Sequence, residues 1–288
     1  MPTVERIREA IIAAIPYTTS NDGQPPDARG VYVPPSHLKA LRLESSLVIG
    51  ARGVGKSFWT AALGDPLLRA MLGGSVRELE RTQVHIGFAL APKIATYPNA
   101  DVFAHLLAQG FRPGEVWRAV VVRWLAPVTQ ITVPVADWAS TTTWVRDHPE
   151  PLAQLMEQAS QHFRAQNQQG LIVFDALDRT SPDWRVMDNI VRDLLQLALW
   201  LKAYPALHAK VFLREDQFAR TVTDFPDASK LLATKAELIW YPHDLHGLLW
   251  QLLCNAPDEH GKVLRELSTQ VLAQSPTQRQ LTWSLPDE

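Results

Sequence analysis

One run in this chain constrains its fold more than any other: Leu47-Val48-Ile49-Gly50-Ala51-Arg52-Gly53-Val54-Gly55-Lys56-Ser57. An apolar stretch precedes the glycines, and a helix-forming stretch at 58–63 follows them. Gly-x-x-x-x-Gly-Lys-Ser between a strand and a helix predicts a loop whose backbone N–H groups surround a phosphate. The run therefore favours an α/β fold in which a strand leads through this loop into a helix.

The residues of the loop have different expected roles. Lys56 is expected to reach the β- and γ-phosphates of a nucleotide, and the hydroxyl of Ser57 is expected to ligate Mg²⁺. A glycine-rich turn with an accidental Lys-Ser pair is the alternative, and the flanking strand and helix argue against it. We expect nucleotide contacts from the whole segment: Gly50, Ala51, Arg52, Gly53, Val54, Gly55, Lys56, Ser57 and Phe58.

The pattern of apolar residues predicts alternating strands and helices, which is typical of a parallel sheet covered on both faces. Strands are expected at 46–50, 84–90, 171–175, 210–214 and 236–241. Helices are expected at 3–15, 36–43, 58–63, 101–126 with a break at 110–114, 152–166, 184–204 and 245–254. Residues 127–151, rich in proline and threonine, are treated as an insertion without assigned structure.

Composition excludes several classes of protein. With 28 basic and 30 acidic residues the net charge is −2, so nucleic-acid binding is not indicated by charge. The single cysteine, Cys254, rules out an internal disulfide and stands in an apolar helical run, so a buried thiol is expected. There is no secretory leader and no apolar run near the ~20 residues that span a bilayer, which predicts a soluble, cytoplasmic protein without membrane association.

Two acidic residues follow the apolar strand Leu171–Phe174. Asp175, at the tip of that strand, is expected to hold Mg²⁺ together with Ser57, because Mg²⁺ prefers one or two carboxylates plus phosphates. A capping aspartate after a core strand is the alternative. Asp178 is a candidate base that orients and deprotonates an attacking water. Its alternative role is an ion pair with Arg179.

A third candidate follows the strand at 210–214. Arg214 stands where a cation can face the γ-phosphate or stabilise charge on the transferred phosphoryl group. A surface ion pair with Glu215 or Asp216 is the equally weighted alternative. Arg220 is a weaker candidate that would act across a subunit boundary.

ATP is preferred over GTP, because an Asn/Thr-Lys-x-Asp motif that reads guanine is missing. By position in the chain, the adenine is expected against Tyr32, Val33, Pro34 and Pro35. The nine histidines include no pair at metal-binding spacing, so a zinc site is not expected.

Taken together, Gly-Ala-Arg-Gly-Val-Gly-Lys-Ser, Phe-Asp-Ala-Leu-Asp-Arg and Lys-Val-Phe-Leu-Arg-Glu-Asp resemble the additional-strand-catalytic-glutamate class of P-loop ATPases, which is related to the AAA proteins. Within it, the chain resembles the bacterial STAND and KAP-type ATPases. The resemblance implies a sheet of order 5-1-4-3-2, a catalytic carboxylate at Asp178, Mg²⁺ at Ser57 and Asp175, and nucleotide-driven self-association. Such ATPases often serve as switches in multi-protein antiviral defence systems.

The chain departs from these families in two places. Ala176 replaces the second Asp of the KAP pattern, and no Gly-x-Pro follows the fifth strand. We expect residues 1–36 to form an N-terminal helix and an adenine-side loop. Residues 37–255 are expected to form the ATPase core with a helical insertion at about 101–166. Residues 256–288 are expected to begin a C-terminal helical region that is truncated here.

The leading hypothesis is an ATPase that uses Mg²⁺-dependent ATP hydrolysis to switch its assembly with itself or with a partner protein. A small-molecule phosphotransferase and a scaffold that holds ATP without hydrolysing it are the alternatives. A DNA-translocating motor would need a basic stripe, for which the composition gives no support.

Overall fold

The computed structural model describes residues 3–15, 24–218, 220–256 and 258–273. The described residues form two compact units. The larger unit holds residues 24–25 and 35–239, and the smaller unit holds residues 3–15, 26–34 and the described residues from 240 onward. None of the helices in this described part of the chain has the length and apolar character that crossing a bilayer would require.

The larger unit is built on a sheet of five parallel strands, β1 (Leu47–Gly50), β2 (Thr82–Phe88), β3 (Gln169–Phe174), β4 (Leu207–Arg214) and β5 (Ala236–Glu237). Their order across the sheet is β2-β3-β4-β1-β5, which reads 5-1-4-3-2 from the β5 edge. In the register, Gly50 lies opposite Arg214, and Phe174 lies opposite Val211. Strand β4 therefore extends three residues past the end of β3, toward the loop that follows β1.

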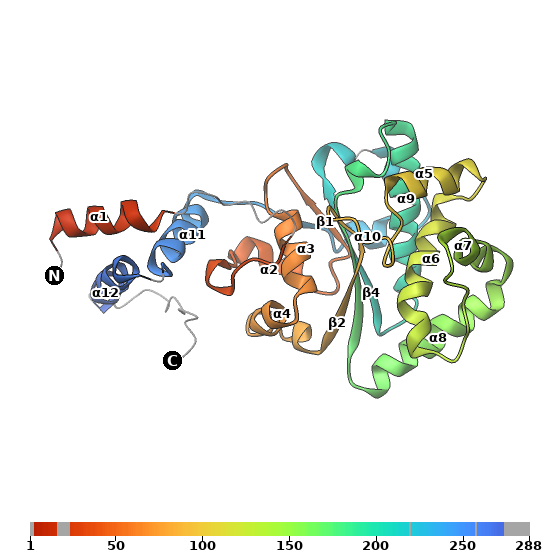
Figure 1. Cartoon of the computed structure of the whole chain (residues 1–288), viewed down its shortest axis with the longest axis horizontal. Helices are drawn as coiled ribbons and strands as arrows, with labels where there is room; N and C mark the ends of the chain where they lie inside the picture. Colours follow the sequence, from red (N-terminus) through yellow and green to blue (C-terminus); the bar gives the residue numbers. More distant parts are fainter. Residues whose placement is uncertain (1–2, 16–23, 219, 257, 274–288) are drawn as a thin grey trace. The chain divides into compact units, whose positions relative to one another are not determined.

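Helices flank this sheet in two groups. Figure 1 shows α2 (Leu38–Leu41), α3 (Lys56–Gly64) and α4 (Pro66–Gly73) on one side of the strands. The other side carries α5 (Ala100–Ala108), α6 (Pro113–Leu125), α7 (Trp138–Asp147), α8 (Pro149–Ala165) and α9 (Trp184–Leu201). A short α10 (Ser229–Leu232) precedes β5. The unit is thus the expected α/β fold with a parallel sheet between helices.

The hydrophobic core lies mainly between the sheet and the second group of helices. Trp117 of α6 is fully buried, and its ring contacts Phe174 of β3 with ring centroids 5.4 Å apart. The indole N–H donates to the carbonyl of Ile190 at 3.0 Å, which satisfies the polar atom of this large side chain. Eight buried residues of α9 face the same core: Met187, Ile190, Val191, Leu194, Leu195, Leu197, Ala198 and Leu201.

Two regions differ from the sequence-based expectation. The fifth strand covers only Ala236–Glu237, because the chain makes its last sheet bond from Leu238 N to Ile49 O at 2.8 Å. The unassigned stretch at 127–151 contains helix α7. The carboxylate of Asp137 accepts from Ser140 N at 2.7 Å and caps this helix, while the buried hydroxyl of Thr142 donates to a backbone carbonyl. Polar threonines are therefore buried here with their hydroxyls satisfied.

The smaller unit consists of α1 (Val4–Ala14), α11 (Pro242–Cys254) and α12 (Glu259–Ala273). Ala10, Leu253, Cys254, Val263 and Leu264 form its apolar centre. The sequence predicts one core over residues 37–255, which would include α11. The structure groups α11 with α1 and α12 instead, because its buried side chains complete their core. The expectation of a buried Cys254 thiol is confirmed, and burial raises its pKa to about 11.

Candidate nucleotide site

The loop between β1 and α3 needs glycine at specific positions. Gly55, directly before α3, has φ +106°, and Gly53 has φ +81°, which are conformations that side chains disfavour. At Gly50, an added Cβ would come within 2.6 Å of the Val54 side chain. The loop is therefore tightly curled, as the Gly-x-x-x-x-Gly pattern predicts.

Lys56 is the first residue of α3, and its side chain folds back over this loop. Its ammonium donates to the carbonyls of Gly50 at 2.9 Å and Ala51 at 2.7 Å. Partial burial lowers the pKa of Lys56, and the nearby carboxylate of Asp175 opposes that effect. The side chain also lines the cavity described below, so its ammonium can exchange carbonyl oxygens for those of a ligand.

Ser57 and Asp175, both predicted as Mg²⁺ ligands, are in direct contact. The Ser57 hydroxyl donates to Oδ2 of Asp175 at 2.6 Å. Asp175 is 2% exposed and follows β3, where its backbone N–H donates to the carbonyl of Phe88 at 2.9 Å. Burial raises the pKa of Asp175, and the bond from Ser57 acts in the opposite direction. A hydroxyl and a buried carboxylate that converge on one point are oxygen donors of the kind that Mg²⁺ prefers.

The chain turns sharply after Asp175. Ala176 has φ +56° and ψ +35°, a left-handed conformation that costs a residue with a side chain about 1–2 kcal/mol. A single helical turn, Leu177–Arg179, follows, and the hydroxyl of Thr180 donates to the carbonyl of Leu177 at 2.7 Å. This strained turn carries Asp178 away from the line of β3 and toward the end of β4.

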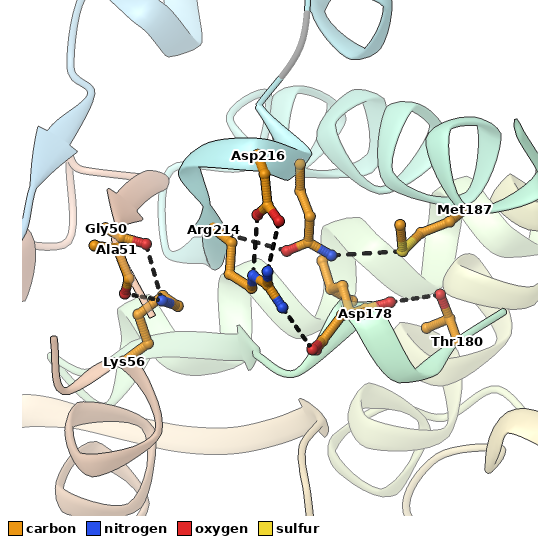
Figure 2. A network of polar contacts seen from close by, with 10 residues as sticks. Gly50, Ala51, Lys56, Asp178, Thr180, Met187, Arg214 and Asp216 are labelled. Carbon is orange, nitrogen blue, oxygen red and sulfur yellow. Dashed lines mark hydrogen bonds and ion pairs between the residues drawn. The ribbon is translucent and has the colours of Figure 1, made fainter. Parts of the chain in front are cut away.

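Asp178 and Arg214 meet between the ends of β3 and β4 (Figure 2). Nη1 of Arg214 lies 3.3 Å from Oδ2 of Asp178. Its Nε and Nη2 donate to the two oxygens of Asp216 at 2.9 and 2.5 Å. These bonds, with Asp216 first, raise the pKa of Arg214. The alternative pairing of Arg214 with Asp216 is thus present together with the contact to Asp178. The alternative pairing of Asp178 with Arg179 is not among the ion pairs of the described residues.

Two residues of this network were not predicted as site residues. The sequence predicts Asp216 only as an alternative partner of Arg214, and it gives Gln217 no role in the site. Gln217 is buried, and its Oε1 accepts from the backbone N–H of Arg214 at 3.1 Å. Its Nε2 reaches the sulfur of Met187 on α9 at 3.5 Å, which ties the end of β4 to that helix. The signal for both residues was their position directly after a strand that ends at the site.

A cavity of about 300 Å³ connects these groups. Of the predicted loop residues, the structure does not put Gly50, Ala51 or Val54 on its wall: the first two supply carbonyls to Lys56, and Val54 packs against Gly50. The lining residues are Arg52, Gly53, Gly55, Lys56, Ser57, Phe58, Leu90, Asp175, Ala176, Asp178, Arg179, Phe212, Arg214 and Gln217.

A second cavity of about 260 Å³ adjoins the first and shares Ser57, Leu90 and Asp175 with it. It extends between α3 and the end of β2. Its further lining is mostly apolar and includes Ala61, Ile86, Ala89 and Tyr97. A second small molecule in this cavity would therefore lie against the predicted Mg²⁺ ligands.

Two further predictions lie apart from these cavities. The side chain of Arg220 lies outside the described residues. Of the residues expected to contact adenine, Tyr32, Val33 and Pro34 belong to the smaller unit, where Tyr32 stacks on Trp240 with ring centroids 6.3 Å apart. Pro35 belongs to the larger unit. Contact between these residues and adenine stays a prediction.

Comparisons with models of protein families, with curated proteins and with solved structures gave no match. The class that the fold defines is an α/β protein with an all-parallel sheet.

Proposed function

We propose that this chain binds Mg·ATP in the cavity at the loop of residues 50–57 and hydrolyses it with a water nucleophile. One observation carries the proposal: the hydroxyl of Ser57 and the buried carboxylate of Asp175 are 2.6 Å apart at a cavity that Lys56 also lines. Lysine, hydroxyl and carboxylate are the three groups that P-loop enzymes use to hold a triphosphate and its metal.

Each group has a distinct task in this proposal. The backbone N–H groups of the curled loop and the ammonium of Lys56 bind the phosphates. Ser57 and Asp175 hold Mg²⁺, which neutralises charge on the phosphate oxygens when bound. Asp178 orients the attacking water and takes its proton, and Arg214 stabilises the charge that develops on the γ-phosphoryl group.

Two variants separate binding from turnover. Lys56→Ala removes the cation that contacts the phosphates, so we expect ATP affinity to fall by at least about a hundredfold, as measured by calorimetry. Asp178→Ala leaves the phosphate loop intact, so ATP still binds while phosphate release drops by about a hundredfold or more. Equal rates of ATP hydrolysis in the wild type and in Asp178→Ala would contradict the role given to Asp178.

We also propose that hydrolysis switches self-association or binding to a partner protein, as the resemblance to STAND and KAP ATPases implies. The specific rate of ATP hydrolysis should then rise with protein concentration, because assembly would complete the site. A specific rate that is constant from nanomolar to micromolar protein, with a monomer at every concentration in light scattering, would contradict self-association.

A small-molecule phosphotransferase is the second candidate, and the cavity of about 260 Å³ beside Ser57 and Asp175 favours it. A phosphoryl acceptor bound there would face the γ-phosphate. Hydrolysis predicts one free phosphate for each ADP formed with no second substrate present. Negligible ADP formation from ATP alone, restored by a metabolite mixture with the phosphoryl group recovered on a component of that mixture, would favour the transferase. Ala89→Phe, which fills this cavity, would then abolish the transfer.

A further inference from the structure

The guanidinium of Arg214 is shared unequally between two carboxylates. Asp216 takes Nε and Nη2 at 2.9 and 2.5 Å, while Asp178 takes only Nη1 at 3.3 Å (Figure 2). The contact with Asp216 is the two-pronged arrangement that holds a guanidinium plane most firmly. Asp216 therefore sets the orientation of Arg214, and the bond to Asp178 follows from it.

The ion pair between Arg214 and Asp216 contributes little to the stability of the fold. The Asp216 side chain is 47% exposed and the Arg214 side chain 27% exposed, and ion pairs open to water contribute little to stability. The backbone of Arg214 is already held by pairing with β1 and by the bond to Gln217. The orientation of the guanidinium is thus the main property that Asp216 controls.

The alternative arrangement of Arg214 would harm a base at Asp178. Without Asp216, the guanidinium is free to turn its two-pronged edge onto Asp178, which lies within reach at 3.3 Å. A carboxylate held in that way is a weaker base, because the cation favours its charged form. In the described part of the chain, Asp178 accepts a hydrogen bond from Arg214 alone, so one of its oxygens remains available for water.

We propose that Asp216 is a positioning residue for Arg214. This inference rests on the proposed ATPase function. Asp216 holds Arg214 so that a single N–H group points at Asp178 and the cavity. This arrangement prevents Arg214 from forming a two-pronged pair with the base. It also presents the guanidinium to the phosphoryl group without a search through rotamers.

The test compares Asp216→Asn with Arg214→Ala and with the double variant. We expect Asp216→Asn to lower kcat on the order of tenfold or more with KM changed by less than about twofold, because it acts on turnover through Arg214. The double variant should be no slower than Arg214→Ala alone, because Asp216 has no role once Arg214 is gone. Asp147→Asn is the matched control, since Asp147 pairs with Arg146 at 3.1 Å on α7, and it should keep the wild-type kcat.

The pH profile gives a readout that a structural role would not move. In Asp216→Asn the closer pair with Arg214 should shift the acid limb of the kcat profile to lower pH. An Asp216→Asn variant with wild-type kcat and an unchanged acid limb would overturn this inference and leave the proposed ATPase function in place. A double variant clearly slower than Arg214→Ala would also overturn the inference. A wild-type protein that binds ATP but never releases phosphate would overturn the proposed function and this inference with it.

Discussion

Lys210 and Lys56 of the larger unit each donate to more than one backbone carbonyl, but their surroundings differ. Lys210, in β4, is 0% exposed and donates to the carbonyls of Ala40 at 2.7 Å, Arg42 at 2.9 Å and Ser45 at 2.8 Å. Lys56 is partly exposed and donates to only two carbonyls of its own loop, beside a cavity. One ammonium joins distant segments of the fold, and the other lies where a ligand can replace its partners.

The comparison shows what separates a structural cation from one that can serve a ligand. Three acceptors use all the donor positions of an ammonium, so Lys210 has no capacity for a further partner. Burial lowers the pKa of Lys210 to about 7, which is the electrostatic cost of keeping this group out of water. Lys56 keeps one donor position and access to the cavity. Lys210 should therefore matter for stability, and Lys56 for binding.

The largest change in the free energy of unfolding is expected for Lys210→Met. This change keeps the apolar stem but leaves three buried carbonyls without their donor, so the free energy of unfolding should fall by about 3 kcal/mol or more. Denaturant unfolding measures it. Lys202→Met is the control, because Lys202 is exposed and donates to Lys230 O at 3.3 Å, and it should change stability by less than about 0.5 kcal/mol. A similar loss of stability in both variants would contradict the structural role given to Lys210.

A smaller effect should appear in acid. His208, also in β4, has a pKa lowered to about 4, by burial first and then by the charges of Lys210 and Lys202. In the unfolded state His208 is therefore protonated as the pH falls below about 6.5, whereas in the folded state it is protonated only below about pH 4. The free energy of unfolding should decrease as the pH falls from about 6.5 to about 4, by up to about 3 kcal/mol. Unfolding by urea at several pH values measures this slope.

Substitutions can show which groups cause this change of the free energy of unfolding with pH. His208→Gln should flatten it, although His85, whose burial also lowers its pKa to about 4, contributes with the same sign. Lys210→Met should narrow the pH range over which stability is lost, because removal of the nearby charge raises the pKa of His208 in the folded state. Lys56→Met should leave that range unchanged. A slope that is insensitive to both His208→Gln and Lys210→Met would show that the charge of Lys210 does not act on its surroundings in this way.

The smallest expected change in stability is for Lys56→Met. Its ammonium is partly exposed and its two carbonyl partners can bond to water, so the free energy of unfolding should change by less than about 1 kcal/mol. On the proposed function, Mg·ATP should raise the melting temperature of the wild type but not that of Lys56→Met, because the variant lacks the cation that contacts the phosphates. Stabilisation of Lys56→Met by ATP to the wild-type extent would remove the distinction between the two lysines.

The sequence predicts those parts of the site that are marked by neighbouring residues in the chain. The loop at 50–57 and Asp175 follow apolar strands, and parallel strands bring such residues to one edge of the sheet. Asp178 and Arg214 were predicted as separate candidates for the same reason, since each follows one of two strands that turn out to be neighbours, β3 and β4. Their shared ion pair could not be predicted, because it depends on the left-handed turn at Ala176.

The features that were missed depend on distant segments. The sequence predicts Lys210 only as the first residue of a strand. Its three hydrogen-bond acceptors lie on the segment at 40–45, and no local sequence pattern indicates that contact. The bounds of helix α7 were not predicted, because Thr141 and Thr142 are polar in the sequence yet fully buried in the structure. Helix α11 was assigned to the wrong unit, since an apolar face does not reveal which core it completes.

The order of elements along the chain has a consequence for biosynthesis. Helix α1 is synthesised before the sheet, whereas α11 and α12, with which it shares a core, are synthesised after the sheet. The larger unit begins and ends at neighbouring points, because the hydroxyl of Ser36 donates to the carbonyl of Ile239 at 2.8 Å. Once that unit has folded, the loop that separates α1 from its partners is effectively short, and little entropy is lost in closing it. The core that α1 shares with α11 and α12 can therefore form only after the sheet has been synthesised, and until then the apolar side chains of α1 that pack into that core lack their partners.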